Sequence, residues 1–356
     1  MTQSTMDVPL KAKSCPAWIN ANSDAKGYYR MDYQGGLLTA LTTGDVTSRL
    51  SAPERVDLIG NVEAMARAGK IAPADALGLV ETFHGDSERD VVERTLGVAL
   101  SPGTHLVTKE LRPNYQRFLQ KNFLAKARGL GWTPTAGESD DIRLLRPRLV
   151  EAVATDAGDR ALSKEALQLA GKWLEDRKAV SPDVAGAVLR TAGYYGDTGL
   201  FQRFLTEFQK TQDRQEQQDL LRAMNSFRDP AALELGMQAL LSKKVALADG
   251  FPLLFGGQES IETQKMPFEF VKAHFDDIMK DHPSIFGFDF GSLLPRVGAG
   301  LCDAASRSEL QTFFGPIASK YTGAPRTLAQ VLEGVDLCIA NKAALQSGVT
   351  EFLKRY

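Results

Sequence analysis

Apolar residues recur every three or four positions along most of the chain after residue 50, which is the spacing of one face of an α-helix. The first stripe follows Ser51-Ala52-Pro53-Glu54, which has the form of a capping box, and Gly69 can end that helix. Ser181-Pro182 and Asp229-Pro230 each supply an N-cap residue and a proline at a helix start. The stripes span residues 58–66, 142–153, 166–174, 184–192, 200–208, 220–227, 233–241, 268–279, 310–317 and 328–335.

Each of these predicted helices has a single apolar face, which it cannot bury alone. The stripes follow one another at short and uneven steps, which is typical of stacked antiparallel helix pairs. The sequence therefore predicts a mainly α fold, an α-α superhelix of the HEAT or armadillo kind. Residues 133–141 form the most loop-like break, and residues 282–300, rich in Gly, Phe and Pro, remain unassigned.

The first fifty residues differ from the rest of the chain. The segment from Tyr28 to Tyr33 is rich in aromatic residues and lies between Gly27 and Gly35-Gly36, which predicts a strand. Residues 6–10 and 18–20 are candidates for shorter extended segments. Two or three strands cannot form a stable sheet alone. Either they pack on the helices or their partner strands are missing.

Composition and charge exclude some partners. The chain has 356 residues, of which 43% are hydrophobic and 24% charged, and its net charge is −2 with the two signs interspersed. No block of basic residues marks a nucleic-acid or anionic-membrane surface. No stretch approaches the roughly 18 consecutive apolar residues that a membrane helix needs.

The three cysteines, Cys15, Cys302 and Cys338, are widely spaced and form no Cys-x-x-Cys pair. This spacing predicts neither a zinc ribbon nor a dense disulfide framework. We interpret one or more of them as free thiols that act as small buried hydrophobic side chains.

The four histidines do not form a zinc-peptidase motif, because none is four residues from another and none is followed by Glu. His274 and His282 are eight residues apart beside several aspartates, so a shared metal is conceivable on one helix. An exposed acidic helix end is the alternative. The sequence also lacks a Gly-x-Ser-x-Gly elbow and a Walker loop.

Arg143, Arg146 and Arg148 cluster around Pro147. Guanidinium groups bind carboxylates and phosphates as a fork, so this cluster is a candidate anion site. A solvated helix face is the alternative. Arg326, just before the last apolar stripe, has the same two interpretations.

The residues Gly27-Tyr28-Tyr29-Arg30, preceded by Trp18-Ile19-Asn20, resemble a signature of the aminopeptidase N family of zinc aminopeptidases, which includes puromycin-sensitive aminopeptidase. In that family this strand ends a small β-sandwich, directly before a C-terminal helical domain. Weaker landmarks follow in the family's order and extend the resemblance from residue 15 to about 345. They are Arg146-Pro147-Arg148-Leu149 with Gly158-Asp159, Ala223-Met224-Asn225 with Asp229-Pro230, and Gly323-Ala324-Pro325-Arg326 with Gln330 and Glu333.

The resemblance implies that residues 1–36 are the remnant of a β-sandwich domain and residues 37–356 the helical superhelix domain. The family's zinc helix and its Gly-Ala-Met-Glu-Asn loop lie in a domain that would precede this chain, and neither motif occurs here. We therefore assign no catalytic residue and no metal ligand, and expect the chain alone to bind no zinc and hydrolyse no peptide. Its partners would be the catalytic domain of the same polypeptide, which holds the zinc, and peptide substrates.

The implied role is to enclose the active site and help receive the peptide, with Arg146 or Arg326 as candidate contacts for a peptide carboxylate. Gly27, Tyr28, Tyr29 and Arg30 would have only a structural role. The alternative is a self-contained helical-repeat scaffold that binds a protein or peptide on its concave face.

Overall fold

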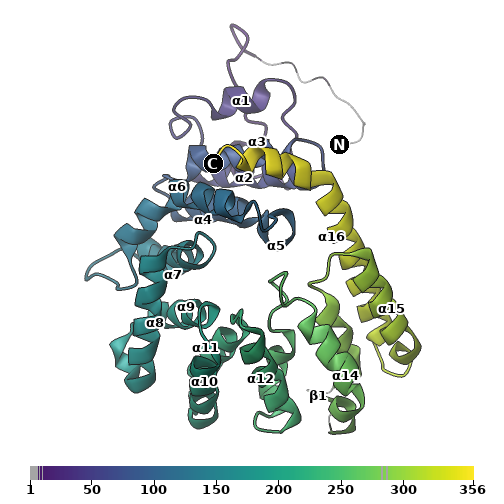
Figure 1. Ribbon diagram of the computed structural model, residues 1–356. Helices are drawn as coiled ribbons and strands as arrows, with labels where there is room; N and C mark the ends of the chain where they lie inside the picture. Colours follow the sequence, from purple (N-terminus) through teal and green to yellow (C-terminus); the bar gives the residue numbers. More distant parts are fainter. Residues whose placement is uncertain (1–6, 8, 10, 282–283, 286–287) are drawn as a thin grey trace.

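The computed structural model describes residues 7, 9, 11–281, 284–285 and 288–356, and is almost entirely helical. Its helices follow one another around a curved path that brings the last helix back beside the first ones (Figure 1). The α-helices are α1 Leu37–Thr42, α2 Ala52–Arg67, α3 Pro73–Phe83, α4 Arg89–Leu100, α5 Gly103–Leu106, α6 Arg112–Leu130, α7 Asp140–Thr155, α8 Arg160–Glu175, α9 Pro182–Tyr194, α10 Thr198–Lys210, α11 Arg214–Asn225, α12 Pro230–Leu241, α13 Leu247–Gly250, α14 Met266–Asp281, α15 Ala304–Ala318 and α16 Ala324–Leu353.

The remaining elements are short. They are the 3-10 helices η1 Ser23–Ala25, η2 Arg177–Ala179, η3 Phe251–Phe255, η4 Phe290–Ser292 and η5 Leu294–Gly298, and the antiparallel strands β1 Ser284–Ile285 and β2 Phe288–Asp289. The last four of these lie in the segment 282–300 that the sequence left unassigned. No helix among the described residues is both long and apolar enough to cross a membrane.

The predicted helix boundaries that rest on capping chemistry are confirmed. Ser51 and Glu54 form the capping box of α2, with the Ser51 amide donating to the Glu54 carboxylate at 2.8 Å. Ser181 and Asp229 are the N-caps of α9 and α12, each followed by proline at the first helical position. The loop-like break is the connection between α6 and α7.

Helix pairs stack in two layers, as the short steps between stripes predicted. The helices α4, α7, α9 and α11 contact one another in that order along the inside of the curve, and α6, α8 and α10 pack against them from outside. The apolar stripes bury into one continuous core that includes Phe118, Phe204 and Phe227, all fully buried. This burial is the main force that holds the layers together.

The closure of the curve by α16 was not predicted. The sequence indicated only the stripe 328–335, whereas α16 runs on to Leu353 and packs against α3, α5 and α6 near the other end of the chain. The ring of Phe118 lies 5.4 Å from that of Phe352 and 5.1 Å from that of Tyr356. The helices therefore form a ring rather than an open superhelix (Figure 1).

The predicted N-terminal strand is wrong. No strand is present in the described part of residues 7–36, and Tyr28–Tyr33 form bends and irregular chain. A strand needs a partner to satisfy its backbone groups, and none is available here. Met6, Val8 and Leu10 lie outside the described residues.

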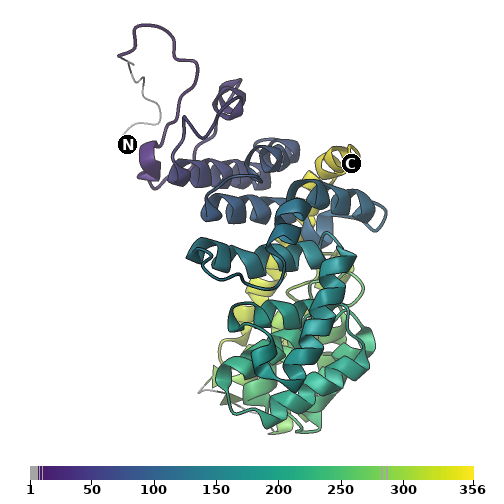
Figure 2. The same cartoon turned by 90° about the vertical axis from the view of Figure 1, so that its left-hand side faces the viewer.

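Polar side chains attach this N-terminal segment to α2 instead. The Asn22 amide donates to Asp57 at 3.0 Å and to the Gly27 carbonyl at 3.1 Å, and the Asn20 amide donates to Glu54 at 2.8 Å. The segment and α1 lie at one end of the ring, beside α2 (Figure 2). The division of the chain at residue 36 stays a prediction.

Two of the three cysteines form a disulfide and one is a free thiol, which fits the interpretation of one or more free thiols but not that of a buried one. Cys302, just before α15, and Cys338 in α16 form a disulfide across 36 positions of sequence. Cys15 is free, but it is exposed rather than buried. The pairing depends on how α16 packs, which spacing alone does not reveal.

Gly193 permits the close contact between α9 and α11. A Cβ atom there would lie 2.4 Å from the carbonyl oxygen of Ala223 and 3.1 Å from the ring of Phe227. We expect Gly193→Ala to lower the free energy of unfolding by roughly 1–3 kcal/mol, because forced displacement of packed backbone outweighs the gain in helix propensity. Urea unfolding measures the change. Gly171→Ala in α8, where a Cβ meets nothing within 4 Å, should instead raise stability by up to about 1 kcal/mol; equal shifts in the two variants would contradict this account.

Candidate functional site

Three adjoining pockets lie along the inside of the ring, and we call them together the inner groove. The central pocket, of ≈ 600 Å³, is lined by side chains of α7, α9 and α11 and by the segment after η3. A second pocket, of ≈ 580 Å³ against α5 and α6, shares Tyr194, Arg228 and Glu259 with it. A third, of ≈ 470 Å³ against α16, shares Phe255 and Gln258. The groove is large enough for a short peptide.

Among the charged side chains of the central pocket, more basic than acidic groups lack a close partner of opposite charge. Arg190 is neutralised by Glu151, to which it donates two hydrogen bonds of 2.8 and 2.5 Å. Arg228 stacks on the ring of Tyr194 at 5.0 Å and reaches Glu259 only at 4.0 Å. Such exposed and distant pairs contribute little.

Arg222 and Asn225, which are three residues apart on α11, both line the central pocket. The Arg222 guanidinium is exposed and has no ion-pair or hydrogen-bond partner in the part of the chain that the structure describes. The side-chain oxygen of Asn225 is buried and also lacks a hydrogen-bond partner there. The two residues that line this cavity thus carry an unpaired cationic donor and a buried acceptor without a partner, and such an acceptor is unfavourable until a partner arrives.

Arg146, one of the two predicted peptide contacts, points into the protein. Its side chain is only 2% exposed. The guanidinium donates to the carbonyl oxygens of Leu130 and Gly131 and to the carboxylate of Glu138. It holds the loop between α6 and α7, and in this conformation it is not accessible to a peptide.

The rest of the arginine cluster is divided between two surfaces. Arg143 pairs with Asp140 and Asp183 on the exposed side of α7. Arg148 lines the central pocket, where its nearest acidic partner, Glu93, is 3.7 Å away. Of the three arginines, therefore, only Arg148 faces the inner groove.

Arg326, the other predicted contact, is exposed in the first turn of α16. No ion-pair or hydrogen-bond partner for its guanidinium lies within the described chain. The next residue, Thr327, lines the third pocket of the inner groove. The position is compatible with the predicted role, which stays a prediction.

The four signature residues lie at the N-terminal end, away from the inner groove. The Gly27 amide donates to Asn22 at 2.6 Å and the Tyr29 hydroxyl to the Ala21 carbonyl at 2.6 Å. Tyr28 is fully exposed, and the Arg30 side chain has no hydrogen-bond or ion-pair partner within the described chain. A Cβ at position 27 would lie 2.1 Å from the Tyr29 ring, so this turn requires glycine as it stands.

The histidine pair that could have shared a metal remains unresolved. The ring of His274 lies 3.9 Å from Asp277. His282 lies outside the described residues, so the pair cannot be placed. Arg222, Arg228 and Asn225 were not predicted as groove residues from the sequence, where their only signal was the landmark Ala223-Met224-Asn225.

Comparisons with known proteins identify the class. Residues 18–337 match the family described as the ERAP1-like C-terminal domain, and the chain belongs to that family. The resemblance drawn from Gly27-Tyr28-Tyr29-Arg30 and the landmarks after it is thereby confirmed: this is the C-terminal helical domain found in M1 aminopeptidases.

Three of the similar relatives show what kind of protein this chain resembles, and each is an aminopeptidase by name. Aminopeptidase M1-B of Oryza sativa subsp. japonica is 26% identical over 282 residues, which cover 77% of this chain and 32% of the relative. Aminopeptidase M1 of Arabidopsis thaliana is 25% identical over 94% of this chain and 38% of its own length. The puromycin-sensitive aminopeptidase of Caenorhabditis elegans is 21% identical over 83% of this chain and 32% of its own length. The chain thus spans about a third of the relatives that it matches.

Proposed function

We propose that this chain is the non-catalytic C-terminal domain of a zinc aminopeptidase, where it encloses the active site and receives peptide substrates in the inner groove. Membership of the family and the aminopeptidase names of the relatives support the first part. A ring of helices with a groove inside it supports the second. The specific interactions with peptide are inferred from the groove's chemistry alone.

The residues of this chain do not fit the zinc of such an enzyme. The sequence contains no His-Glu-x-x-His, the arrangement that holds the metal and the general base on one helix. The catalytic step therefore belongs to another domain of the polypeptide. We expect this chain alone to hydrolyse no peptide.

The observation that carries the peptide-receiving role is the pair of unpartnered groups on α11. A peptide offers a carboxylate, which an arginine binds with a charge-assisted hydrogen bond, and backbone N–H groups, which the Asn225 oxygen can accept. Arg222 would bind the carboxylate, with Arg148 and Arg228 adding positive potential around it. Arg326, beside the third pocket, is a second candidate for the same group.

We expect Arg222→Gln to weaken binding of a peptide with a free C-terminal carboxylate roughly tenfold, which corresponds to one hydrogen bond to a charged group. Fluorescence anisotropy of a labelled peptide measures the affinity. Arg203→Gln, which removes the same charge from the exposed side of α10, is the matched control and should have no effect. Arg326→Gln, alone and combined with Arg222→Gln, tests the second candidate.

A C-terminally amidated peptide should bind the unaltered chain as weakly as the free peptide binds the Arg222→Gln variant. If the two peptides bound with equal affinity, the proposal that the groove recognises the peptide carboxylate would be wrong. Equal behaviour of Arg222→Gln and Arg203→Gln, or no saturable binding at all, would remove the peptide-receiving role.

A self-contained scaffold that binds a protein or peptide inside the ring is the second candidate, supported by the same groove. Reading the genomic DNA upstream of the codon for Met1 separates the two. An in-frame His-Glu-x-x-His would support the aminopeptidase domain. A stop codon would overturn it in favour of the scaffold.

A further inference from the structure

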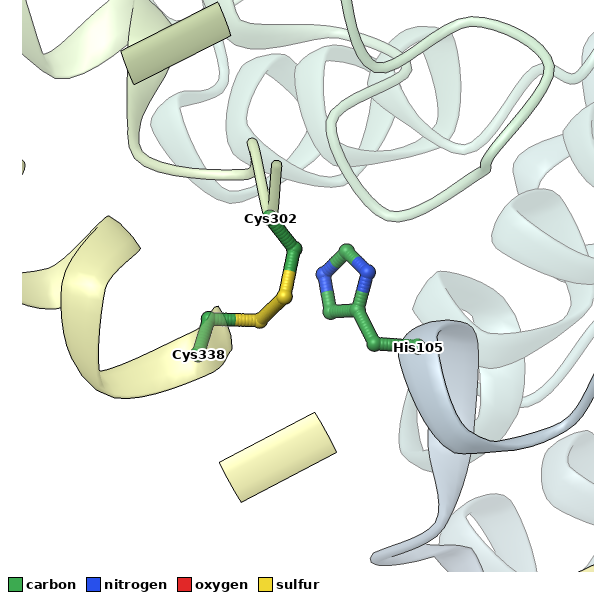
Figure 3. A group of neighbouring side chains, drawn as sticks. All are labelled: His105, Cys302 and Cys338. Carbon is green, nitrogen blue, oxygen red and sulfur yellow. A yellow bond between two sulfur atoms is a disulfide. The ribbon is translucent and has the colours of Figure 1, made fainter. Parts of the chain in front are cut away.

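Three potential metal ligands meet where α16 closes the ring. The Sγ atoms of Cys302 and Cys338 and a ring nitrogen of His105 all lie within 4.8 Å of one another. They come from three separate elements, since His105 is in α5, Cys302 precedes α15 and Cys338 is in α16 (Figure 3). Figure 3 shows the imidazole ring directly beside the two sulfur atoms.

The positions of these groups are set by packing rather than by flexible surface chain. Cys302 is buried, and Cys338 and His105 are half-buried. The helix α16 packs on α5 and on η5, which leads into Cys302. Because packed helices hold His105 and Cys338, and Cys302 is buried between η5 and α15, the three side chains are brought together by the fold, as a metal site requires.

In the disulfide the sulfur atoms are not available as metal ligands, because thiolates are the ligands that bind zinc. A dithiol reductant makes the sulfur atoms available by supplying two electrons and two protons to the disulfide. The S–S bond breaks, two thiols form, and the reductant is oxidised to its own disulfide. Both sulfur atoms can then ionise.

We propose that the reduced chain binds Zn²⁺ through the thiolates of Cys302 and Cys338 and the imidazole of His105. The two thiol protons are released as the metal binds. Tetrahedral bond lengths place ligand atoms roughly 3.5–3.8 Å apart, so small rotations of the cysteine side chains would adapt the observed cluster. A fourth position would be left to water or an external ligand.

The disulfide and the metal would be alternative cross-links at the place where α16 closes the ring. The disulfide joins Cys302 only to α16, whereas the metal would also attach α5 through His105. The state of this site would therefore decide how firmly the two ends of the ring are held together. This proposal differs from our expectation from the sequence that the chain alone binds no zinc, and it concerns a different site from the zinc of the proposed parent enzyme.

The test uses the full chain with Cys15→Ser, which removes the remaining free thiol. The protein is reduced with a dithiol, freed of reductant without oxygen, and titrated with Co²⁺ as a spectroscopic substitute for Zn²⁺. We expect one Co²⁺ per chain, with a thiolate-to-metal charge-transfer band and the intense visible bands of tetrahedral cobalt. Zn²⁺ should displace it.

The oxidised protein of the same sequence is the first control and should show no charge-transfer band. Cys302→Ser and Cys338→Ser should each weaken binding at least about a hundredfold, and His105→Ala roughly ten- to a hundredfold. His84→Ala, which removes another half-buried histidine that is not in the cluster, is the matched control and should change nothing.

The site would be overturned if the reduced chain bound Co²⁺ no more tightly than the oxidised chain, or if His105→Ala and His84→Ala gave the same affinity. Circular dichroism of each variant shows whether it is folded, and the oxidised control needs no substitution at all. None of these outcomes bears on peptide binding in the inner groove, so the two proposals can fail separately.

Discussion

Replacing Arg146 with Met is expected to lower the free energy of unfolding by about 3–5 kcal/mol, the usual cost of removing one partner of a buried ion pair. Arg146 is 2% exposed and the Glu138 side chain 7% exposed. The substitution leaves the Glu138 carboxylate without its cation and the carbonyl of Leu130 without its donor. Urea unfolding of the wild type and the variant measures the difference.

Two further variants identify the cause. Arg143→Met, one turn away on the exposed side of α7, should cost less than about 1 kcal/mol. The double variant Arg146→Met/Glu138→Leu should recover most of the loss, because replacing both partners of a buried pair by apolar groups is often nearly neutral. If Arg146→Met were as mild as Arg143→Met but weakened peptide binding, the role predicted from the sequence would be correct and the structural role wrong.

The loss of stability in the Arg146→Met variant should also depend on pH. Burial raises the pKa of Glu138, but the Thr135 amide and the Arg146 guanidinium lower it, and the net shift is downward from 4.5. A carboxyl whose pKa is lowered by folding contributes stability that is present above 4.5 and is lost as the pH falls through the lowered value. The difference in free energy of unfolding between the wild type and Arg146→Met should therefore become smaller below about pH 4.

Arg146 illustrates the limit of prediction from the sequence. The spacing of apolar residues located the helix correctly, and the charges around Pro147 identified an arginine cluster. The pattern did not show that Arg143, Arg146 and Arg148 point to three different surroundings. That depends on where the loop of Glu138 folds, and so on packing between α6 and α7.

Local signals predicted local structure well for a physical reason. A cap such as Ser51 or Asp229 acts within one turn of its own helix, so its effect can be read from neighbouring residues. The N-terminal strand failed because its stability depends on partner strands that the sequence does not supply. The groove residues Arg222 and Asn225 carried no local signal beyond the landmark that contains Asn225, because their pocket depends on how α7, α9 and α11 pack against one another.

The most distant contacts were not predicted at all. The closure by α16 brings Phe352 to Phe118 and Cys338 to Cys302, and neither pair shares a motif or a period. A stripe of apolar residues shows that a helix has a buried face but not which helix covers it. The length of α16 was underestimated for the same reason, since its second half meets a different partner from its first.

Replacing Phe118 with Ala is expected to lower the free energy of unfolding by about 3–5 kcal/mol and to loosen the ring at its closure. Phe118 is fully buried and contacts the rings of both Phe352 and Tyr356. Without it, the end of α16 loses its aromatic partner on α6 but keeps the buried side chain of Leu353 and the 2.8 Å hydrogen bond from the Tyr356 hydroxyl to Glu81. Hydrogen exchange of the backbone amides in residues 345–356 should accelerate beyond the global loss of stability.

Phe204→Ala in α10 is the matched control, because Phe204 is equally buried and packs edge to face on Phe227, away from α16. Both variants remove a fully buried ring, so both should lose a similar amount of global stability. Only Phe118→Ala should produce locally faster exchange at the C-terminus. Because α16 lines the third pocket of the inner groove, the same variant should also bind peptide more weakly than Phe204→Ala. Identical exchange patterns in the two variants would mean that the ring is held closed by the other contacts of α16 with the first helices, which are those with α3 and α5.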